Sequence, residues 1–395
     1  MLLERLRLAN FRNYETLDLA LLPGLSIFQG RNAQGKSNLL ESIALLATSR
    51  SFRAGGERET VRWDAPGHFA RVDAHLSRRT GPLSVEIVIA DPPSLSASRQ
   101  NMDHTAFQAP PALRKRVKIN GVPRRAMDLL GQVNVVLFVP SDLDLVTGTP
   151  LYRRHYLDVI LCQTDHHYCH ALSQFQKVQT QRAALLRRIR EQEEDPRSLT
   201  FWDEQFAQLS ATLILGRVRM IERLHAGAQR FYEQLSGGEE QVAVVYRPSY
   251  AGALAASKPD ELARSFRSEL TTLRKREINA GVNLLGPHRD DLAFLSGRMD
   301  LGIYGSRGQQ RSAALALKLA ELEFLQAETD ERPILLLDDV LSELDEQRRG
   351  YLVGIVKGLA QVLLTTTELA TLPPDLLSSA SARYRVKAGT VQEIG

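Results

Sequence analysis

The sequence predicts an α/β fold: a phosphate-loop head built on a parallel sheet, with a helical arm and a second, smaller lobe. Three observations predict it. Residues 30–37 match the pattern G-x-x-x-x-G-K-[ST]. Residues 333–339 form an apolar run that ends in two aspartates. Between these motifs, residues 151–235 have the length and apolar spacing of long helices.

The composition is that of a globular protein with reduced thiols. The 395 residues are 43% hydrophobic and 24% charged, which suffices for a large core and more than one subdomain. A net charge of +4 permits nucleic-acid binding without requiring it. Two cysteines, Cys162 and Cys169, do not indicate a disulfide framework. Early charges at Glu4, Arg5 and Arg7 leave no signal-peptide core, and no apolar run reaches membrane-spanning length. We therefore expect a cytoplasmic protein.

The phosphate loop has the expected local context. Residues 25–28 form an apolar strand before it, and residues 37–46 form a helix whose positive dipole end faces the loop. Glycines let successive N–H groups point at phosphate oxygens, Lys36 adds a charge near the β- and γ-phosphates, and the Ser37 hydroxyl binds Mg²⁺. The expected nucleotide contacts are Gly30, Arg31, Asn32, Ala33, Gln34, Gly35, Lys36, Ser37 and Asn38.

The segments around this loop are predicted to be mainly strands. Residues 2–19 alternate as a hairpin, and residues 57–90 favour sheet. Between them lies a basic, glycine-rich segment in which Arg50 and Arg53 either touch phosphate or DNA or belong to an ordinary solvated loop. Residues 91–112 have no apolar period and read as a loop or insertion.

A basic hairpin follows. Asn120 and Gly121 stand between isoleucine and valine, which is a strong signal for a two-residue turn. The hairpin either contacts DNA phosphates or is a solvated turn. The candidate DNA contacts there are Lys115, Arg116, Lys118, Arg124 and Arg125.

A buried strand is expected at 133–139, followed by two long helical stretches, 151–190 and 199–235, that form an antiparallel arm. A helix of forty residues would be about 60 Å long, which is far shorter than a chromosome-scale coiled coil. Three histidines in the first stretch, His166, His167 and His170, have no completing ligands, so we interpret them as structural or surface residues.

Two segments compete for the role of the signature sequence of ABC ATPases, which must open a helix so that its N–H groups face a γ-phosphate. Residues 235–238 read Leu-Ser-Gly-Gly, but a strand follows, so we interpret Ser236 as part of a helix C-cap and turn. Residues 306–309 precede a helix-forming run that leads to the acidic strand. The predicted signature contacts are Ser306, Gly308 and Gln309.

The run at 333–339 fits a Walker B strand. One acid, Asp338, is expected to hold Mg²⁺ together with Ser37, and the next, Asp339, to polarise the attacking water. With Lys36 these are the predicted catalytic residues. Residues 342–345 are expected to cross a dimer interface, and 362–364 to form one more core strand.

Over essentially its full length the chain resembles the RecF family of ABC/SMC-like ATPases. The resemblance rests on Gly30–Glu41, Gly286–Leu292, Ser306–Arg311 and Leu335–Asp345, of which Gly-Pro-His-Arg-Asp-Asp-Leu at 286–292 is the most specific. It implies an ATP- and Mg²⁺-dependent homodimer with slow, DNA-stimulated hydrolysis. It also implies binding to double-stranded DNA near single-strand gaps, and work with RecO and RecR in loading RecA during nucleoid-associated recombination, repair, replication restart and the SOS response.

The resemblance divides the chain into an ATPase head, 1–148 with 282–395, and a largely helical arm or second lobe, 149–281. There are departures from ABC transporters: Asp339 stands where they carry glutamate, as in RecF-like chains, and threonines 365–367 replace their switch histidine. The equivalent of the Q-loop is expected within 138–148. We expect residues 286–291 to support the active head and not to bind a metal.

Two other interpretations stay open. One is a generic SMC-like or ABC-type ATPase, although a transporter subunit would need the switch histidine and a chromosome-scale SMC protein would need long heptad repeats. The other is a DNA clamp that ATP binding closes and in which hydrolysis is incidental.

Overall fold

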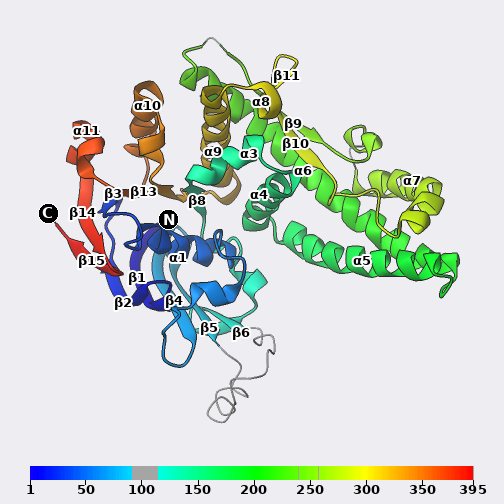
Figure 1. The fold of residues 1–395 in the computed structure, drawn as a ribbon, viewed down its shortest axis with the longest axis horizontal. Coiled ribbons are helices and arrows are strands. Elements are labelled where there is room, and N and C mark those ends of the chain that lie inside the picture. The colour runs from blue at the N-terminus through cyan, green and yellow to red at the C-terminus, as the bar shows by residue number, and fades with distance from the viewer. Residues whose placement is uncertain (91–113, 239, 257, 395) are drawn as a thin grey trace. The chain divides into compact units, whose positions relative to one another are not determined.

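The computed structural model describes residues 1–90, 114–238, 240–256 and 258–394 (Figure 1). The predicted loop at 91–112 lies outside them. The chain forms two compact units, which we call the head unit (Met1–Pro140 with Leu325–Gly395) and the helical unit (Ser141–Phe324). Residues 282–324 therefore group with the helical unit and not with the head, contrary to our expectation. The reason is strand pairing, because β10 (Asp291–Ser296) is antiparallel to β9 (Ala243–Arg247).

The head unit contains a six-stranded, mostly parallel sheet with the order β15-β14-β3-β13-β12-β8. Four of its strands, β3, β13, β12 and β8, are mostly apolar and buried, as expected where both faces are covered. β3 lies between β14 and β13, and β12 is next, so β3, β13 and β12 all end at the same edge. The bounds are β3 Gly24–Gln29, β8 Val135–Phe138, β12 Ile334–Asp338, β13 Gln361–Thr366, β14 Ala380–Lys387 and β15 Thr390–Glu393.

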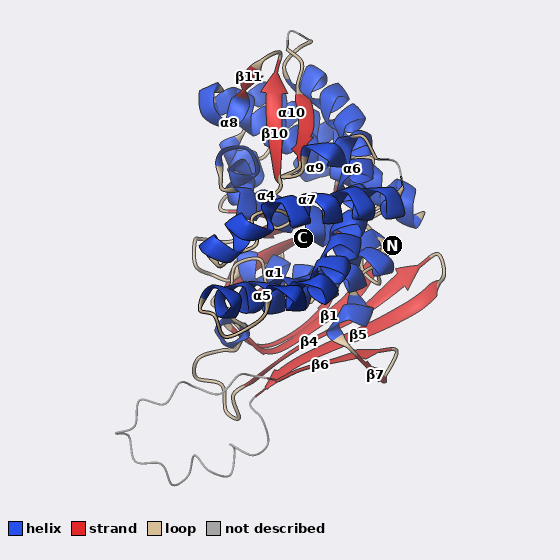
Figure 2. Ribbon diagram, turned by 90° about the vertical axis from the view of Figure 1, so that its right-hand side faces the viewer, coloured by secondary structure: helices blue, strands red, loops and turns tan. Residues whose placement is uncertain are grey.

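A second, antiparallel sheet in the head unit has the order β2-β1-β4-β5-β6-β7 (Figure 2). One face is apolar and shares a core with the helix α1 (Lys36–Thr48), whereas the other face carries charged side chains. Residues 57–60, which we expected to be sheet, form a 3₁₀ turn instead. The bounds are β1 Leu2–Phe11, β2 Tyr14–Ala20, β4 Phe69–Arg78, β5 Gly81–Ala90, β6 Arg114–Ile119 and β7 Val122–Arg124.

The predicted basic hairpin is confirmed. Asn120 and Gly121 join β6 to β7 with φ angles of 50° and 75°, the left-handed backbone that a two-residue turn of this kind requires.

The helical unit is built around α6 (Leu199–Leu235), which packs against α5 (His166–Arg190) and α7 (Pro259–Ala280). The single helix predicted over 151–190 is wrong: α4 (Pro150–Thr164) ends first. Asp165 then leaves helical geometry, and its carboxylate accepts hydrogen bonds from the backbone N–H groups of the first turn of α5. The histidines at 166, 167 and 170 are exposed.

The remaining elements are short, except for α9. The small sheet β9-β10 is completed by β11, and α9 starts in the helical unit and ends in the head unit. None of the helices in the described part of the chain has the length and apolar character that crossing a membrane requires. The bounds are α3 Asp144–Thr147, β11 Met299–Asp300, α8 Leu301–Tyr304, α9 Arg307–Thr329, α10 Glu346–Val356 and α11 Pro374–Ser378.

Candidate nucleotide-binding site

The phosphate loop follows β3 at the carboxyl edge of the parallel sheet, and α1 begins at its Lys36. At two of its glycines a side chain would be strained or would clash. Gly35 has φ 118°, and a Cβ on Gly30 would lie 2.4 Å from the backbone oxygen of Val386. The sequence pattern therefore reflects both backbone strain and close approach of a neighbouring strand.

The loop is held from outside by segments distant in sequence. The backbone oxygen of Gln34 accepts hydrogen bonds from the Asn13 side chain at 2.9 Å and from the Gly389 N–H at 3.0 Å. The hydroxyl of Tyr14 donates to the backbone oxygen of Gly35 at 3.0 Å. These bonds use carbonyl groups on the outside of the loop, which fixes its curvature without using its N–H groups.

Lys36 bends back over the loop. Its ammonium donates to the backbone oxygens of Gly30 at 2.5 Å and Arg31 at 3.1 Å. Burial lowers the pKa of Lys36, and the nearby carboxylates of Asp339 and Asp338 oppose this shift. The positive charge therefore lies between the loop and the acids at the end of β12.

Asp338, the last residue of β12, meets the start of α1. Its Oδ1 accepts hydrogen bonds from the hydroxyl of Ser37 at 2.9 Å and from that of Thr365 at 2.8 Å. The structure thus brings together the two predicted Mg²⁺ ligands, which are 301 residues apart in the chain. A hydroxyl beside a carboxylate is an all-oxygen donor set, which fits this hard cation.

Asp339 leaves the strand in a left-handed conformation with φ 55°. Its backbone N–H donates to the Thr365 hydroxyl at 3.0 Å, and its backbone oxygen accepts from the Ser342 hydroxyl at 2.6 Å. Burial raises the pKa of the Asp339 carboxyl, while the Lys36 ammonium opposes this shift. A carboxylate that the backbone holds in place is suited to accept a proton.

Thr365 is a site residue that sequence reasoning did not identify. We noted it only as part of the threonine run in place of a histidine, yet it touches both acids. The signal was its place at the end of a predicted core strand, because carboxyl ends of parallel strands meet at one edge.

Other predicted loop contacts act on neighbouring segments. Asn38 donates to Asn13 at 2.9 Å and accepts from Arg53 at 3.3 Å. Close by, the fully buried carboxylate of Glu41 accepts two hydrogen bonds from Arg12 at 2.6 and 3.0 Å. Asn38 and Glu41 lie in the first half of α1, so Arg53 of the basic segment reaches back along the helix to Asn38.

The predicted DNA-binding residues of the head unit divide into two groups. Lys115 points inward, where its ammonium donates to the backbone oxygen of Ser49 at 2.5 Å and pairs with Glu57. Lys118 forms an ion pair with Glu86 at 3.0 Å. The others are exposed to solvent: Arg50, Arg53, Arg116, Arg124 and Arg125.

The two signature-like segments differ as predicted in their helix context. The backbone N–H of Ser236 donates to Tyr232 at 2.9 Å and closes α6. Ser306 instead caps the start of α9: its hydroxyl accepts from the Gln309 N–H at 3.2 Å, and its own N–H donates to the Gln309 side chain at 2.9 Å. This reciprocal pair is a capping box. Gly308 lies in the first turn of α9.

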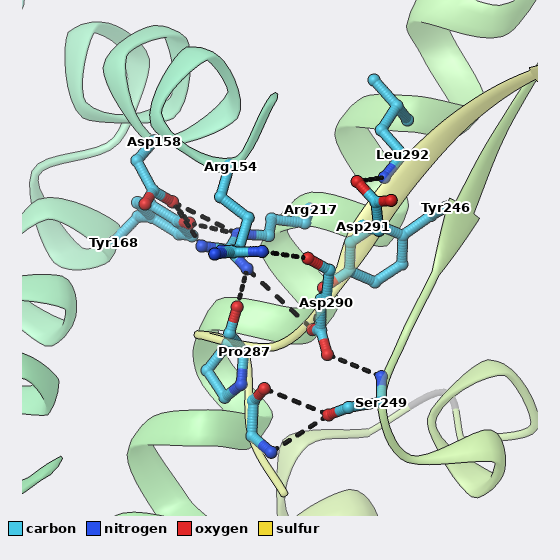
Figure 3. Close-up of polar contacts among 11 residues, drawn as sticks. Arg154, Asp158, Tyr168, Arg217, Tyr246, Ser249, Pro287, Asp290, Asp291 and Leu292 are labelled. Atoms are coloured by element: carbon cyan, nitrogen blue, oxygen red, sulfur yellow. Dashed lines mark hydrogen bonds and ion pairs between the residues drawn. The ribbon is translucent and has the colours of Figure 1, made fainter. Parts of the chain in front are cut away.

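The family-specific string at 286–292 belongs to a buried polar network in the helical unit (Figure 3). Arg217 of α6 donates to Asp158 at 2.8 Å and to the backbone oxygen of Pro287 at 2.7 Å, and lies 3.9 Å from Asp290. Asp290, which has no exposed surface, also accepts from the Ser249 N–H at 2.7 Å and from the Tyr246 hydroxyl. The string therefore ties α4 and α6 to the strands β9 and β10.

His288, in the same string, packs against the rings of Phe175 and Phe206, with centroids 6.0 and 6.2 Å away. Burial lowers the pKa of His288 to about 4. Among the described residues, no three histidine, cysteine or acidic side chains gather as a cluster that could hold a metal.

Comparison with known proteins agrees with this geometry. Residues 2–388 match the family described as the RecF/RecN/SMC N terminal domain. The chain is 43% identical over 408 residues to the DNA replication and repair protein RecF of Chloroflexus aurantiacus, covering 99% of each. It is 36% identical over 398 residues to RecF of Halalkalibacterium halodurans, covering 100% of each.

Solved structures give the same result. A structure of the recombination mediator protein RecF with ATP, in the RecFOR pathway, superposes with a TM-score of 0.86 at 30% identity, covering 100% of this chain and 97% of that one. The SMC head domain of Pyrococcus furiosus, at 15% identity, superposes with a TM-score of 0.53 over 99% of this chain and 95% of that one, which shows a shared fold.

Proposed function

The chain belongs to the family of RecF, RecN and SMC N-terminal domains, and we propose that it is a DNA replication and repair ATPase whose ATP-bound dimer holds DNA. The observation that carries the proposal is the meeting of Ser37 and Asp338 at 2.9 Å beside Lys36. The relatives described as DNA replication and repair proteins, and a relative solved with ATP, support it.

The head unit supplies the groups for ATP binding and hydrolysis. Lys36 exchanges its two loop carbonyls for phosphate oxygens, and Ser37 and Asp338 would hold Mg²⁺, which would neutralise phosphate charge. The carboxylate of Asp339 polarises the attacking water and accepts its proton. Turnover is slow and stimulated by DNA, so that hydrolysis acts as a switch.

The signature acts in the second copy of the homodimer. The loop residues Lys36 and Ser37 and the two acids of the β12 end lie on one side of the triphosphate. The outer face of the γ-phosphate therefore stays negative and uncovered. The Ser306 hydroxyl and the N–H groups at the start of α9, including that of Gly308, complement this charge. ATP binding then closes the dimer, and hydrolysis reopens it.

The exposed arginines of the head unit bind DNA phosphates, and the preferred DNA is double-stranded next to a single-strand gap. The RecFOR context of the solved relative supports a role with RecR and RecO, and indirectly RecA, in cytoplasmic recombination, repair, replication restart and the SOS response. A clamp with incidental hydrolysis is the alternative. Turnover with and without DNA, compared for wild type and Asp339→Asn, separates the two.

The test compares two serines in ATP-dependent dimerisation, followed by light scattering. Ser306→Arg should bind ATP normally and fail to dimerise, because the arginine fills the place of the γ-phosphate. Ser236→Arg, at the end of α6, is the matched control and should dimerise largely as wild type. Asp339→Asn should bind ATP and trap the dimer. The opposite behaviour of the two serine variants would make residues 235–238 the true signature.

A further inference from the structure

The residue Glu240, which follows the signature-like segment at 235–238, contacts the predicted signature at 306–309. Glu240 follows that segment, between α6 and β9. Its two carboxylate oxygens accept from the side-chain amide of Gln309 at 3.0 and 3.1 Å, and one of them accepts from the hydroxyl of Tyr232 at 2.7 Å. The backbone oxygen of Glu240 lies 3.4 Å from the Ser236 hydroxyl, which donates to it. All these residues belong to the helical unit.

This contact decides which way round the Gln309 amide sits. A carboxylate only accepts hydrogen bonds, so it must face Nε2 of the amide. The opposite end, Oε1, then faces the N–H of Ser306 and accepts from it at 2.9 Å. A flipped amide would set its oxygen against the carboxylate and its nitrogen against the Ser306 N–H, which would lose both bonds.

The orientation extends to the Ser306 hydroxyl. With Gln309 in place, its backbone N–H donates to Ser306 Oγ at 3.2 Å. A hydroxyl that accepts in this way keeps its own hydrogen for a further acceptor. The cap therefore presents a donor, and a γ-phosphate oxygen is the acceptor that the proposed function requires.

We propose that Glu240 is a positioning residue: its carboxylate, held by Tyr232, fixes the Gln309 amide and so aligns the cap of α9 toward the γ-phosphate of a second copy of this chain. The inference deepens the proposed function and rests on it. Glu240, which follows the segment at 235–238, thus supports the signature at 306–309.

The main variant is Glu240→Ala, with Glu233→Ala near the end of α6 as control. Dimerisation in ATP, titrated by light scattering, should weaken about tenfold for Glu240→Ala, as expected for a lost hydrogen bond to a charged group. ATP affinity of the monomer should not change, because the phosphate loop lies in the head unit. The conservative Glu240→Gln keeps one acceptor for Nε2, and it should dimerise within about threefold of wild type.

A double-mutant cycle tests whether the effect passes through Gln309. Gln309→Ala should weaken dimerisation at least as much as Glu240→Ala does, and the double variant should be no worse than Gln309→Ala alone. Multiplying effects would overturn the inference, as would wild-type dimerisation of Glu240→Ala. If Glu240→Ala dimerises like wild type while Ser306→Arg still abolishes dimerisation, only this inference fails. Wild-type dimerisation of Ser306→Arg would contradict the proposed function itself.

Discussion

The chain contains two pairs of adjacent aspartates, each at one end of a strand. Asp338 ends β12 and Asp339 follows it in the head unit. Asp290 precedes β10 and Asp291 begins it in the helical unit. The side-chain partners of Asp338 are neutral hydroxyls at 2.8 and 2.9 Å. By contrast, Asp291 receives two hydrogen bonds from Arg153, at 2.6 and 2.9 Å, and Asp290 lies in the network of Arg217.

This difference separates a candidate binding site from a structural support. An acid whose charge is already matched by a guanidinium gains little from a cation, whereas an acid whose hydrogen-bond donors are neutral hydroxyls has no such partner charge in contact with it. The residue types are identical in the two pairs. What distinguishes them is which segments the fold brings against each pair.

The largest expected effect comes from making the same Asp→Asn substitution in each pair. Asp290→Asn leaves Arg217 with Asp158 as its remaining carboxylate, and we expect the free energy of unfolding to fall by about 3 kcal/mol, the low end for a broken buried pair. Asp338→Asn, the matched control, should leave thermal unfolding nearly unchanged while abolishing Mg²⁺-dependent ATP binding. Equal losses of stability in both variants would erase the distinction.

The second prediction concerns Lys36 of the phosphate loop. Lys36→Met removes the ammonium beside Gly30 and Arg31, and we expect ATP affinity to fall about 100-fold, the loss of two charge-assisted hydrogen bonds. Isothermal titration and ATP-dependent DNA retention measure the loss. Lys357→Met, whose ammonium pairs with Asp375 at 2.7 Å, serves as the exposed control. An affinity for ATP within about threefold of wild type would contradict the assignment.

The third prediction concerns the cost of placing a positive charge on His288, which is partly buried in the helical unit. Its pKa of about 4 lies below the ordinary value of 6.5, so between these pH values the folded state binds fewer protons than the unfolded state. Stability contributed by the neutral ring is therefore present above pH 6.5 and lost as pH falls toward 4.

The substitution His288→Gln removes this titration. At pH 5 wild type should have lost about 2 kcal/mol relative to pH 8 through this group, and the variant should lack that decrease. Denaturant unfolding at the two pH values measures it. The same pH dependence in both proteins would show that His288 is protonated in the folded state.

The smallest expected effect concerns the exposed arginines of the head unit. Replacing Arg124 and Arg125 with alanine should lower the slope of log affinity for DNA against log salt by about two units. Lys118→Ala should change the slope less, since its charge is already paired with Glu86. Fluorescence anisotropy over a salt series measures both, and an unchanged slope in the double variant would remove the hairpin from the DNA-binding surface.

The sequence by itself determined the features that depend on contiguous residues. The phosphate loop with its strand and helix, the turn at Asn120 and Gly121, the end of α6 at Ser236 and the start of α9 at Ser306 all follow from local backbone preferences and capping. The break at Asp165 is local as well, because its side chain caps the start of α5. The helix-forming residues on both sides of it nevertheless predict one continuous helix.

Tertiary structure alone decided which distant side chains meet. Strand order placed Thr365 between the phosphate loop and Asp338, and strand register turned Lys115 inward to Ser49. Pairing of β9 with β10 moved 282–324 into the helical unit, and Glu240 met Gln309 across 69 positions. Periods of 2 and 3.6 residues encode which face of an element is apolar, but not which element lies beside it, and this is why the partners of each charge required the fold.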